Sequence, residues 1–470
     1  MNSKILKSKV ISSAAVLSLI FGLSGAAVSQ ETSVSGTTNN NSNDVVISLK
    51  DLPKVGGTIQ MIGAIEYLEA KHNTPVAPNE RDDARLYLFL KQARLNFSGT
   101  RDDIKYYVQM QFGGEEVPNG TNSVYSLLDA YVDAPILQNN LGVRFGQFKV
   151  PFSREMLSDP ASLQFGDTSI NTTAFNIQRD VGIAFHGATS NIYWALGTFS
   201  GGGIDIPQRY IPQSLGIPQL VARIGYDTLD KDVFSARQSD NNRKGTGFAA
   251  YVSGSYEKNS SVGHGQVFTT KKTDTSWFKN AGWNPYLSQA NIEDLNEASL
   301  AQYEADIAYQ TEFSGMKFFV AAEANYGKYD SEAGSLTLKG GQAQFSITYL
   351  PVEVAFRYAI IIPDEELAYK GSTITGATAS QYGPAGLYPI FTDSKPVQQI
   401  NPALNFYLTK NLTVKMDLDI MIDAPVAHED LSGAYNLMIM QGQTSYIQRN
   451  ATVLDRQNAY TARMVAQFVF

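Results

Sequence analysis

The chain has 470 residues, no cysteine and a formal net charge of −8, so it can form no disulfide, and its acidity argues against nucleic-acid binding. Aromatic residues make up 11% of it and there are 38 glycines, while the mean hydropathy is only −0.18. This composition excludes a helical membrane protein and a disordered chain, and it favours many short strands.

The first 29 residues have the pattern of a secretory signal peptide. Lys4, Lys7 and Lys9 precede an apolar run over 10–28 that ends in small residues, and we expect cleavage after Ser29. A signal anchor is the competing interpretation because the run is nearly long enough to span a bilayer, although several serines dilute it. Cleavage would remove three lysines and no acid, which changes the formal charge from −8 to −11.

Residues 30–56 follow as a polar leader, which we expect in the periplasm because it carries too little apolar surface to form a core. Downstream, no apolar stretch approaches the roughly 20 residues of a membrane helix. Instead, segments of about ten residues alternate between apolar and polar, which is typical of transmembrane barrel strands. The region 57–470 is therefore predicted to be an all-β, antiparallel transmembrane barrel.

The alternation is clearest over 104–113, 341–349 and 411–421. In the last of these, the apolar face opposes a face with Lys415, Asp417 and Asp419. The complete pattern predicts sixteen strands, at 57–69, 85–99, 104–113, 125–134, 141–150, 180–188, 190–199, 219–228, 246–257, 301–312, 316–327, 340–350, 352–363, 399–409, 411–423 and 458–470.

The expected connections alternate between long and short, as in outer-membrane barrels with long extracellular loops and short periplasmic turns. Long loops are predicted at 70–84, 114–124, 151–179, 200–218, 258–300, 328–339, 364–398 and 424–457. Residues 229–244 break this rule, because a periplasmic turn should be shorter.

The last eleven residues, Tyr460 to Phe470, alternate as a closing strand with an aromatic terminal residue. Together with the signal peptide and the even strand number, this ending is similar to the sorting signal of bacterial outer-membrane proteins.

Several stretches resemble the phosphate-selective porin O and P family. The most specific is Val143 to Leu157 (VRFGQFKVPFSREML), followed by Arg179 to Gly187 (RDVGIAFHG). Further matching stretches are Phe89 to Thr100, Leu127 to Ala134, Trp194 to Gly202, Val352 to Tyr358 and Pro402 to Asp419. The resemblance implies a sixteen-stranded barrel, usually a homotrimer, whose third extracellular loop folds inward; here that loop is 151–179.

The chain departs from the family in its charges. No stretch carries arginine at every second position, as the family's arginine ladder requires, and the expected lumen faces also carry many acids. Because selectivity follows the sign and density of the lining charge, we expect weak selectivity at most.

Both signs of charge occur among the candidate residues for the pore lining or its constriction. These candidates are Arg94, Lys105, Arg144, Lys149, Arg154, Glu155, Asp159, Asp167, Arg179, Lys415, Asp417 and Asp419. Two alternatives stay open: Lys415, Asp417 and Asp419 bind a cation or merely give a mixed polar face, and the charges of loop 151–179 filter solutes or only stabilise the loop.

Nothing in the sequence indicates an enzyme, a cofactor or a metal site. The four histidines, His72, His186, His264 and His428, have no metal-binding spacing, and no nucleophile motif is present. Trp277 and Trp283 in the 258–300 loop could stack on sugar rings, but packing of the loop explains them more simply.

The sequence as a whole predicts a porin of the bacterial outer membrane, in contact with lipid, that passes small hydrophilic solutes or ions, with phosphate and other anions among the candidates. Two alternatives are a surface protein whose long loops bind an external partner and a substrate-specific uptake channel.

Overall fold

A computed structural model describes residues 53–68, 84–114, 125–137, 141–175, 177–200, 217–238, 245–259, 298–331, 334–363, 396–427 and 454–470, and the statements below concern these residues. The predicted loops at 70–84, 258–300, 364–398 and 424–457 lie largely outside this part of the chain, as do Trp277 and Trp283. Among the described residues, no helix is long and apolar enough to cross a membrane.

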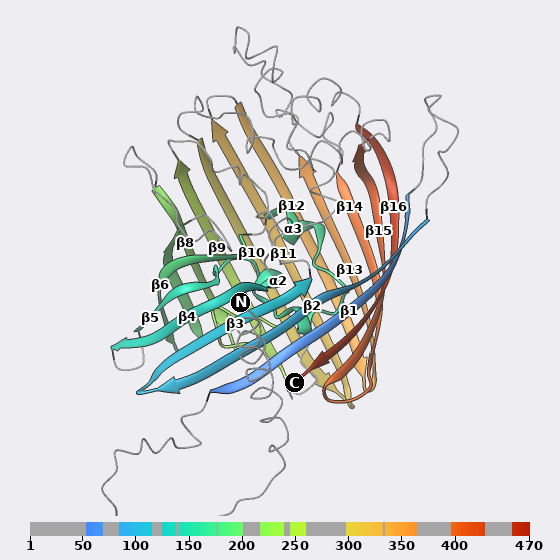
Figure 1. Cartoon of the computed structure of the whole chain (residues 1–470). Helices are drawn as coiled ribbons and strands as arrows, with labels where there is room; N and C mark the ends of the chain where they lie inside the picture. The colour runs from blue at the N-terminus through green and yellow to red at the C-terminus, as the bar shows by residue number, and fades with distance from the viewer. Residues whose placement is uncertain are drawn as a thin grey trace, which may run out of the picture. The chain divides into compact units, whose positions relative to one another are not determined.

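Sixteen antiparallel strands form a closed barrel in which each strand pairs with its neighbours in sequence and β1 pairs with β16 (Figure 1). The strands are β1 (Lys54–Leu68), β2 (Ala84–Arg101), β3 (Ile104–Gly114), β4 (Tyr125–Leu137), β5 (Leu141–Lys149), β6 (Arg179–Thr189), β7 (Ile192–Phe199), β8 (Ile217–Asp227), β9 (Gly247–Asn259), β10 (Ala298–Phe313), β11 (Met316–Ser331), β12 (Gly334–Tyr349), β13 (Val352–Pro363), β14 (Val397–Tyr407), β15 (Leu412–Ala427) and β16 (Leu454–Val469). The predicted barrel and its strand number are thus confirmed.

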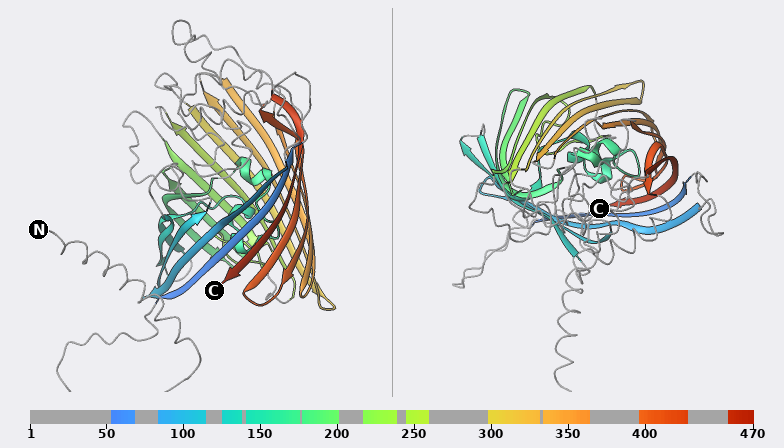
Figure 2. Two further views of the ribbon diagram at one scale, coloured as in Figure 1. Left: turned by 45° about the vertical axis from the view of Figure 1, so that its right-hand side comes forward. Right: turned by 90° about the horizontal axis from the view of Figure 1, so that it is seen from above.

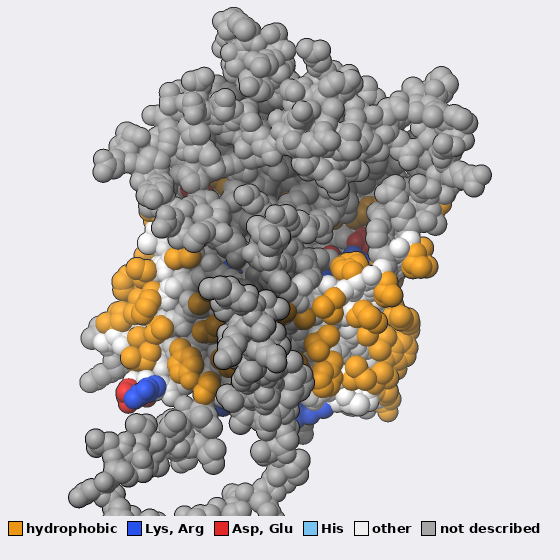
Figure 3. Space-filling view, in the orientation of Figure 1, with side chains coloured by type: hydrophobic (Ala, Val, Ile, Leu, Met, Phe, Trp, Pro, Cys, Tyr) orange, Lys and Arg blue, Asp and Glu red, His pale blue; other side chains and the backbone are white. Residues whose placement is uncertain are grey.

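The two faces of the wall follow the period-two pattern of the sequence. On β12, Gln344 and Ser346 point inward and are buried, whereas Phe345 and Ile347 are exposed on the outside. The outer surface is correspondingly apolar on the face seen in Figure 3. This arrangement is the reverse of a soluble protein, because lipid surrounds the wall and polar groups fill the interior.

The barrel closes through the carboxyl terminus. Gly57 N donates to Phe470 O at 2.9 Å, and Phe470 N donates to Gly57 O at 3.0 Å. The ladder between β1 and β16 then continues from Thr58 opposite Val469 to Leu68 opposite Ala459. The last strand is therefore a structural part of the seam, as its alternation predicted.

Two expectations about where strands begin and end need correction. The loop expected at 328–339 is mostly strand, because β11 runs to Ser331 and β12 begins at Gly334. Its alternating tyrosines, leucines and polar residues extend the ladder instead of ending it. The first strand also begins earlier than expected, at Lys54.

The long connection between β8 and β9 explains the anomaly at 229–244. Its residues 228–238 include Leu229, Val233 and Phe234, which belong to an apolar cluster with lumen-side residues of β5–β11, and Ala236, which is also buried. The connection is long because it packs inside the barrel.

Candidate pore constriction

The connection between β5 and β6, residues 150–178, is called loop 150–178 here. Figure 2 shows its short helices inside the ring of strands when the barrel is seen from above. They are α2 (Arg154–Leu157), η2 (Pro160–Ser162) and α3 (Ile170–Phe175). Local sequence starts these turns: the Asp159 carboxylate accepts a hydrogen bond from Ala161 N at 2.8 Å, and Pro160 occupies the first position of η2.

The middle of loop 150–178 is hydrogen-bonded to the inner face of β13–β15. Gln164 Nε2 donates to Glu353 at 2.7 Å, and Asn405 Nδ2 donates to Gln164 O at 2.9 Å. Gly166 N donates to Asp417 at 2.8 Å. Loop 150–178 leaves the wall after β5 and therefore crosses to strands far away in the sequence.

Glu155 is the charged anchor of the loop. Its carboxylate accepts hydrogen bonds from Arg357 Nη1 at 2.8 Å, Ser169 N at 3.0 Å and Thr172 Oγ1 at 2.6 Å. Burial by itself would raise the pKa of Glu155, but Arg357 and these hydrogen bonds lower it below its usual value. Glu155 is therefore held as a paired carboxylate.

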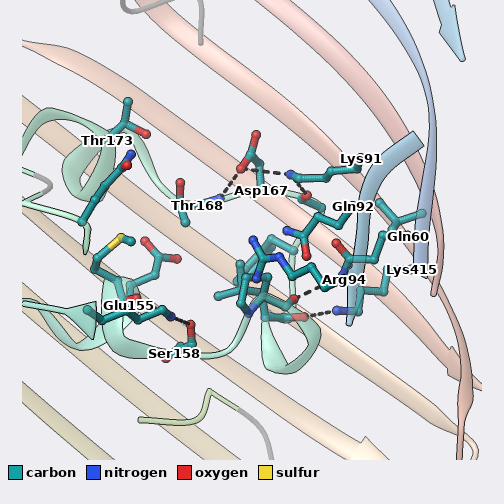
Figure 4. Close-up of a pocket in the computed structure, with 18 of the residues that line it drawn as sticks. Gln60, Lys91, Gln92, Arg94, Glu155, Ser158, Asp167, Thr168, Thr173 and Lys415 are labelled. Carbon is teal, nitrogen blue, oxygen red and sulfur yellow. Dashed lines mark hydrogen bonds and ion pairs between the residues drawn. The ribbon is translucent and has the colours of Figure 1, made fainter. Parts of the chain in front are cut away.

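A cavity of about 130 Å³ lies between loop 150–178 and the wall formed by β1, β2, β15 and β16 (Figure 4). Its charged lining is mostly basic and comes from distant parts of the chain: Lys91, Arg94, Lys149, Arg179 and Lys415, against the acids Glu155 and Asp167. Gln60 and Gln92 add neutral polar groups.

The contacts of these basic groups determine how much of their charge is balanced. Lys149 Nζ donates to the carbonyls of Met156 at 2.8 Å and Ser158 at 2.7 Å. Lys415 Nζ donates to the carbonyl of Leu163 at 2.6 Å. Carbonyls carry no net charge, and within the described residues no carboxylate forms an ion pair with either lysine.

The remaining cations of the cavity have side-chain partners: two form ion pairs and one donates a hydrogen bond to an amide. Lys91 Nζ lies 3.1 Å from Asp167, and Arg179 Nε lies 3.0 Å from Asp129. Arg94 Nε donates to Gln111 Oε1 at 2.8 Å. The two acids of the lining are therefore already engaged, Asp167 with Lys91 and Glu155 with Arg357, so the formal charges of the lining sum to a positive value.

The other predicted site residues lie outside this cavity. Arg144 forms an ion pair of 2.7 Å with Asp133, and Lys105 is exposed near the start of β3. Arg154 pairs with Asp230 at 2.5 Å, and Asp159 serves as the cap of η2.

Asp417 and Asp419 are both held by one arginine of β16. Arg463 Nε lies 2.8 Å from Asp417, and its Nη1 lies 3.1 Å from Asp419. The two carboxylates thereby share one neighbouring cation. No group of metal-ligating side chains is present in the described ranges.

Lys91 and Arg357 belong to the site but were absent from the sequence-based list. Lys91 and Arg94 are three positions apart, so period-two counting places them on opposite faces. The pairing between β2 and β3 shifts register between Gln92 and Arg94, and this irregularity brings both basic side chains to the lumen. A bulge of this kind leaves no clear signal in a single sequence.

A closed barrel of sixteen strands with an apolar outside and a polar interior defines the class of outer-membrane porins. A family model described as phosphate-selective porin O and P matches residues 74–351. The chain belongs to the phosphate-selective porin O and P family, and it is a channel protein of the bacterial outer membrane.

Solved structures of similar fold have low sequence identity to this chain. They include Pseudomonas putida OprB (11% identity, TM-score 0.47, covering 88% of this chain and 94% of that chain). They also include the outer membrane channel DcaP of Acinetobacter baumannii (12%, 0.45, 89% and 97%). A third is OmpT, an outer membrane protein of Vibrio cholerae (10%, 0.46, 89% and 97%). A search of curated proteins gives no match.

Proposed function

We propose that this porin passes small hydrophilic solutes by passive diffusion past loop 150–178, with a preference for anions. The observation that carries the proposal is the cavity beside the loop, where five basic side chains face two acids that are already ion-paired. Phosphate is the first solute to test, because it is small, anionic and named in the description of the family.

Lys149 and Lys415 supply the clearest source of a positive field. Their amino groups are held by backbone carbonyls, which orient them and bring no negative charge to the cavity. A lining charge acts over a short distance in a narrow passage, where it attracts counter-ions and repels ions of the same sign. This arrangement favours anions without the row of arginines that the sequence lacks.

Loop 150–178 supplies the size limit in this proposal. Its anchors to Glu353, Arg357 and Asp417 hold it across the lumen. A loop fixed in this way narrows the passage without closing the barrel, and the size of the remaining space then limits which solutes pass. Assembly as a homotrimer, which the family resemblance implies, is part of the same proposal; cross-linking of the purified protein tests it.

Single-channel recording in planar bilayers tests the proposal. We expect discrete conductance steps, a reversal potential in a KCl gradient that indicates chloride preference, and reduced chloride current when phosphate is added. Removing two positive charges in K149Q/K415Q should shift the reversal potential toward that of an unselective channel.

The matched control is K54Q/K410Q, which also removes two positive charges, from exposed positions at the start of β1 and in the turn between β14 and β15. Its reversal potential should equal that of the parent protein. Absence of conductance steps would contradict passive diffusion, and a cation preference, or an unchanged reversal potential in K149Q/K415Q, would contradict the anion preference.

A further inference from the structure

Residues 228–238, called turn segment 228–238 here, leave the end of the barrel that holds the short turns and fold inward. The Asp227 carboxylate starts the bend by accepting hydrogen bonds from Leu229 N at 2.7 Å and Asp230 N at 2.8 Å. Tyr251 Oη donates to the same carboxylate at 2.9 Å. An aspartate that binds the backbone after itself is a typical turn former.

One face of the turn segment is apolar and buried against the inner wall. The cluster that it joins includes inward-facing residues from seven neighbouring strands, β5 to β11: Phe148, Ala184, Ala195, Phe199, Val221, Ala249, Tyr251, Ala308, Phe319 and Ala321. Apolar side chains of this kind exclude water from the space that they fill. This part of the lumen is therefore packed like a protein core.

Phe234 fixes the turn segment to the wall. The guanidinium of Arg144 lies 3.9 Å from the centre of its ring, and the rings of His186 and Phe148 meet it edge-on at 5.2 Å and 5.8 Å. Arg144 is itself oriented by Asp133. Aromatic and cation–π contacts to three residues of β5 and β6 hold one position of the segment.

The opposite side of the turn segment holds loop 150–178. Asp230 forms a buried ion pair of 2.5 Å with Arg154. Gln238 Nε2 donates to Glu155 Oε1 at 3.0 Å, and its Oε1 accepts from Gln164 N at 3.1 Å. Ser158 and Ala236 form a short parallel β-bridge. The turn segment therefore contacts loop 150–178 within residues 154–158 and again at Gln164.

We infer that turn segment 228–238 is a second constriction element, inserted from the end opposite to loop 150–178. It closes the lumen along β5–β11 and holds the loop, so that solutes pass only through the cationic cavity beside β1, β2, β15 and β16. Asp230 and Gln238 act as positioning residues for this aperture. The inference rests on the proposed function in one respect, because it requires that solutes diffuse through the barrel. It does not require that the channel prefer anions.

Cysteine accessibility tests the position of the path, because the parent chain contains no cysteine. V465C places a thiol in the cavity lining, and A195C places one in the apolar cluster; both native side chains are 2% exposed, so the two sites are matched in burial. Two thiol-reactive methanethiosulfonates are applied to each channel during recording. One carries an anionic sulfonate group and the other a cationic trimethylammonium group.

We expect both reagents to cause a lasting loss of current in V465C and none in A195C. Loss of current in A195C, or its absence in V465C, would overturn the inference. The two reagents separate the path from its selectivity: if the anion preference is wrong, the cationic reagent reacts faster with V465C, but the contrast between the two sites remains.

The second test removes the positioning contacts in D230N/Q238A. We expect a larger conductance, a smaller chloride preference, and loss of current on reagent treatment when A195C is combined with these changes. Heat-dependent migration on gels confirms that the barrel is folded. F234A weakens the contact between turn segment 228–238 and the wall independently of Asp230 and Gln238. A folded D230N/Q238A protein with parental conductance and an unreactive A195C thiol would show that the segment does not set the aperture.

Discussion

Arg357 and Glu155 join the barrel wall to loop 150–178: Arg357 Nη1 lies 2.8 Å from Glu155 Oε1, and the two side chains are 0% and 1% exposed. Arg357 is in turn oriented by Asn401, to which its Nε and Nη2 donate at 3.1 Å and 2.9 Å. Its guanidinium also lies 4.4 Å from the centre of the Phe165 ring. One side chain of β13 thus fixes the loop through both charge and packing.

Replacing this arginine should destabilise the protein and loosen the constriction. R357Q leaves the Glu155 carboxylate buried without its cation, and breaking a buried ion pair costs about 3–5 kcal/mol. We expect a lower free energy of unfolding in urea and larger current fluctuations in single-channel records. The double variant R357Q/E155Q leaves neither charge behind and should recover most of the stability. Equal stability of R357Q and the parent would contradict the role of the pair.

The anchor at Glu155 should also fail in acid. Its pKa in the folded protein is lowered from the usual 4.5, so the ionised form stabilises the folded loop. This stabilisation is fully present above the usual pKa and is lost as the pH falls through the lowered value. We expect steady currents at neutral pH and fluctuating currents only in strong acid. The E155Q channel should lack this acid transition, and an identical transition in E155Q would assign it to another group.

Export of the protein predicts a specific mature terminus. The basic start, the apolar run over 10–28 and the small residues around Ser29 fit recognition by a signal peptidase. Mass spectrometry of the protein from outer membranes should find Gln30 as the first residue. Retention of residues 1–29 would favour the signal anchor instead.

The barrel itself could be predicted because each strand carries its own local evidence. In β15, for example, Met416 and Leu418 alternate with Asp417 and Asp419, and one such segment reveals its two faces without knowledge of its neighbours. The expected loop at 328–339 was wrong because Lys328, Tyr329 and Leu336 do not by themselves show whether a ladder continues; that depends on the opposite strand.

The site was harder to predict because its parts meet only through the closed barrel. Lys149 and Lys415 were candidates, but their common cavity depends on loop 150–178 crossing the lumen between them. Lys91 joins them only because of the shift in pairing near Gln92. Residues 229–244 are too long for a periplasmic turn, and the sequence shows this, yet the inward direction of turn segment 228–238 depends on the apolar side chains that strands β5–β11 place around Phe234.

Closure of the barrel provides the last prediction. A Cβ atom added at Gly57 would lie 2.4 Å from Phe470 Cζ and 2.5 Å from the carbonyl oxygen of Arg94, closer than any side chain tolerates. G57A should therefore push β1 away from both β16 and β2, at a cost of about 1–3 kcal/mol for overpacking. We expect slower assembly of heat-stable barrels when the unfolded protein is added to detergent or lipid vesicles. The matched control is G254A on β9, where the nearest atom, Tyr303 Cδ1, is 3.6 Å from the added Cβ and contact is ordinary. If both variants assemble at the parental rate, close approach at Gly57 is not required to seal β1 to the carboxyl-terminal strand.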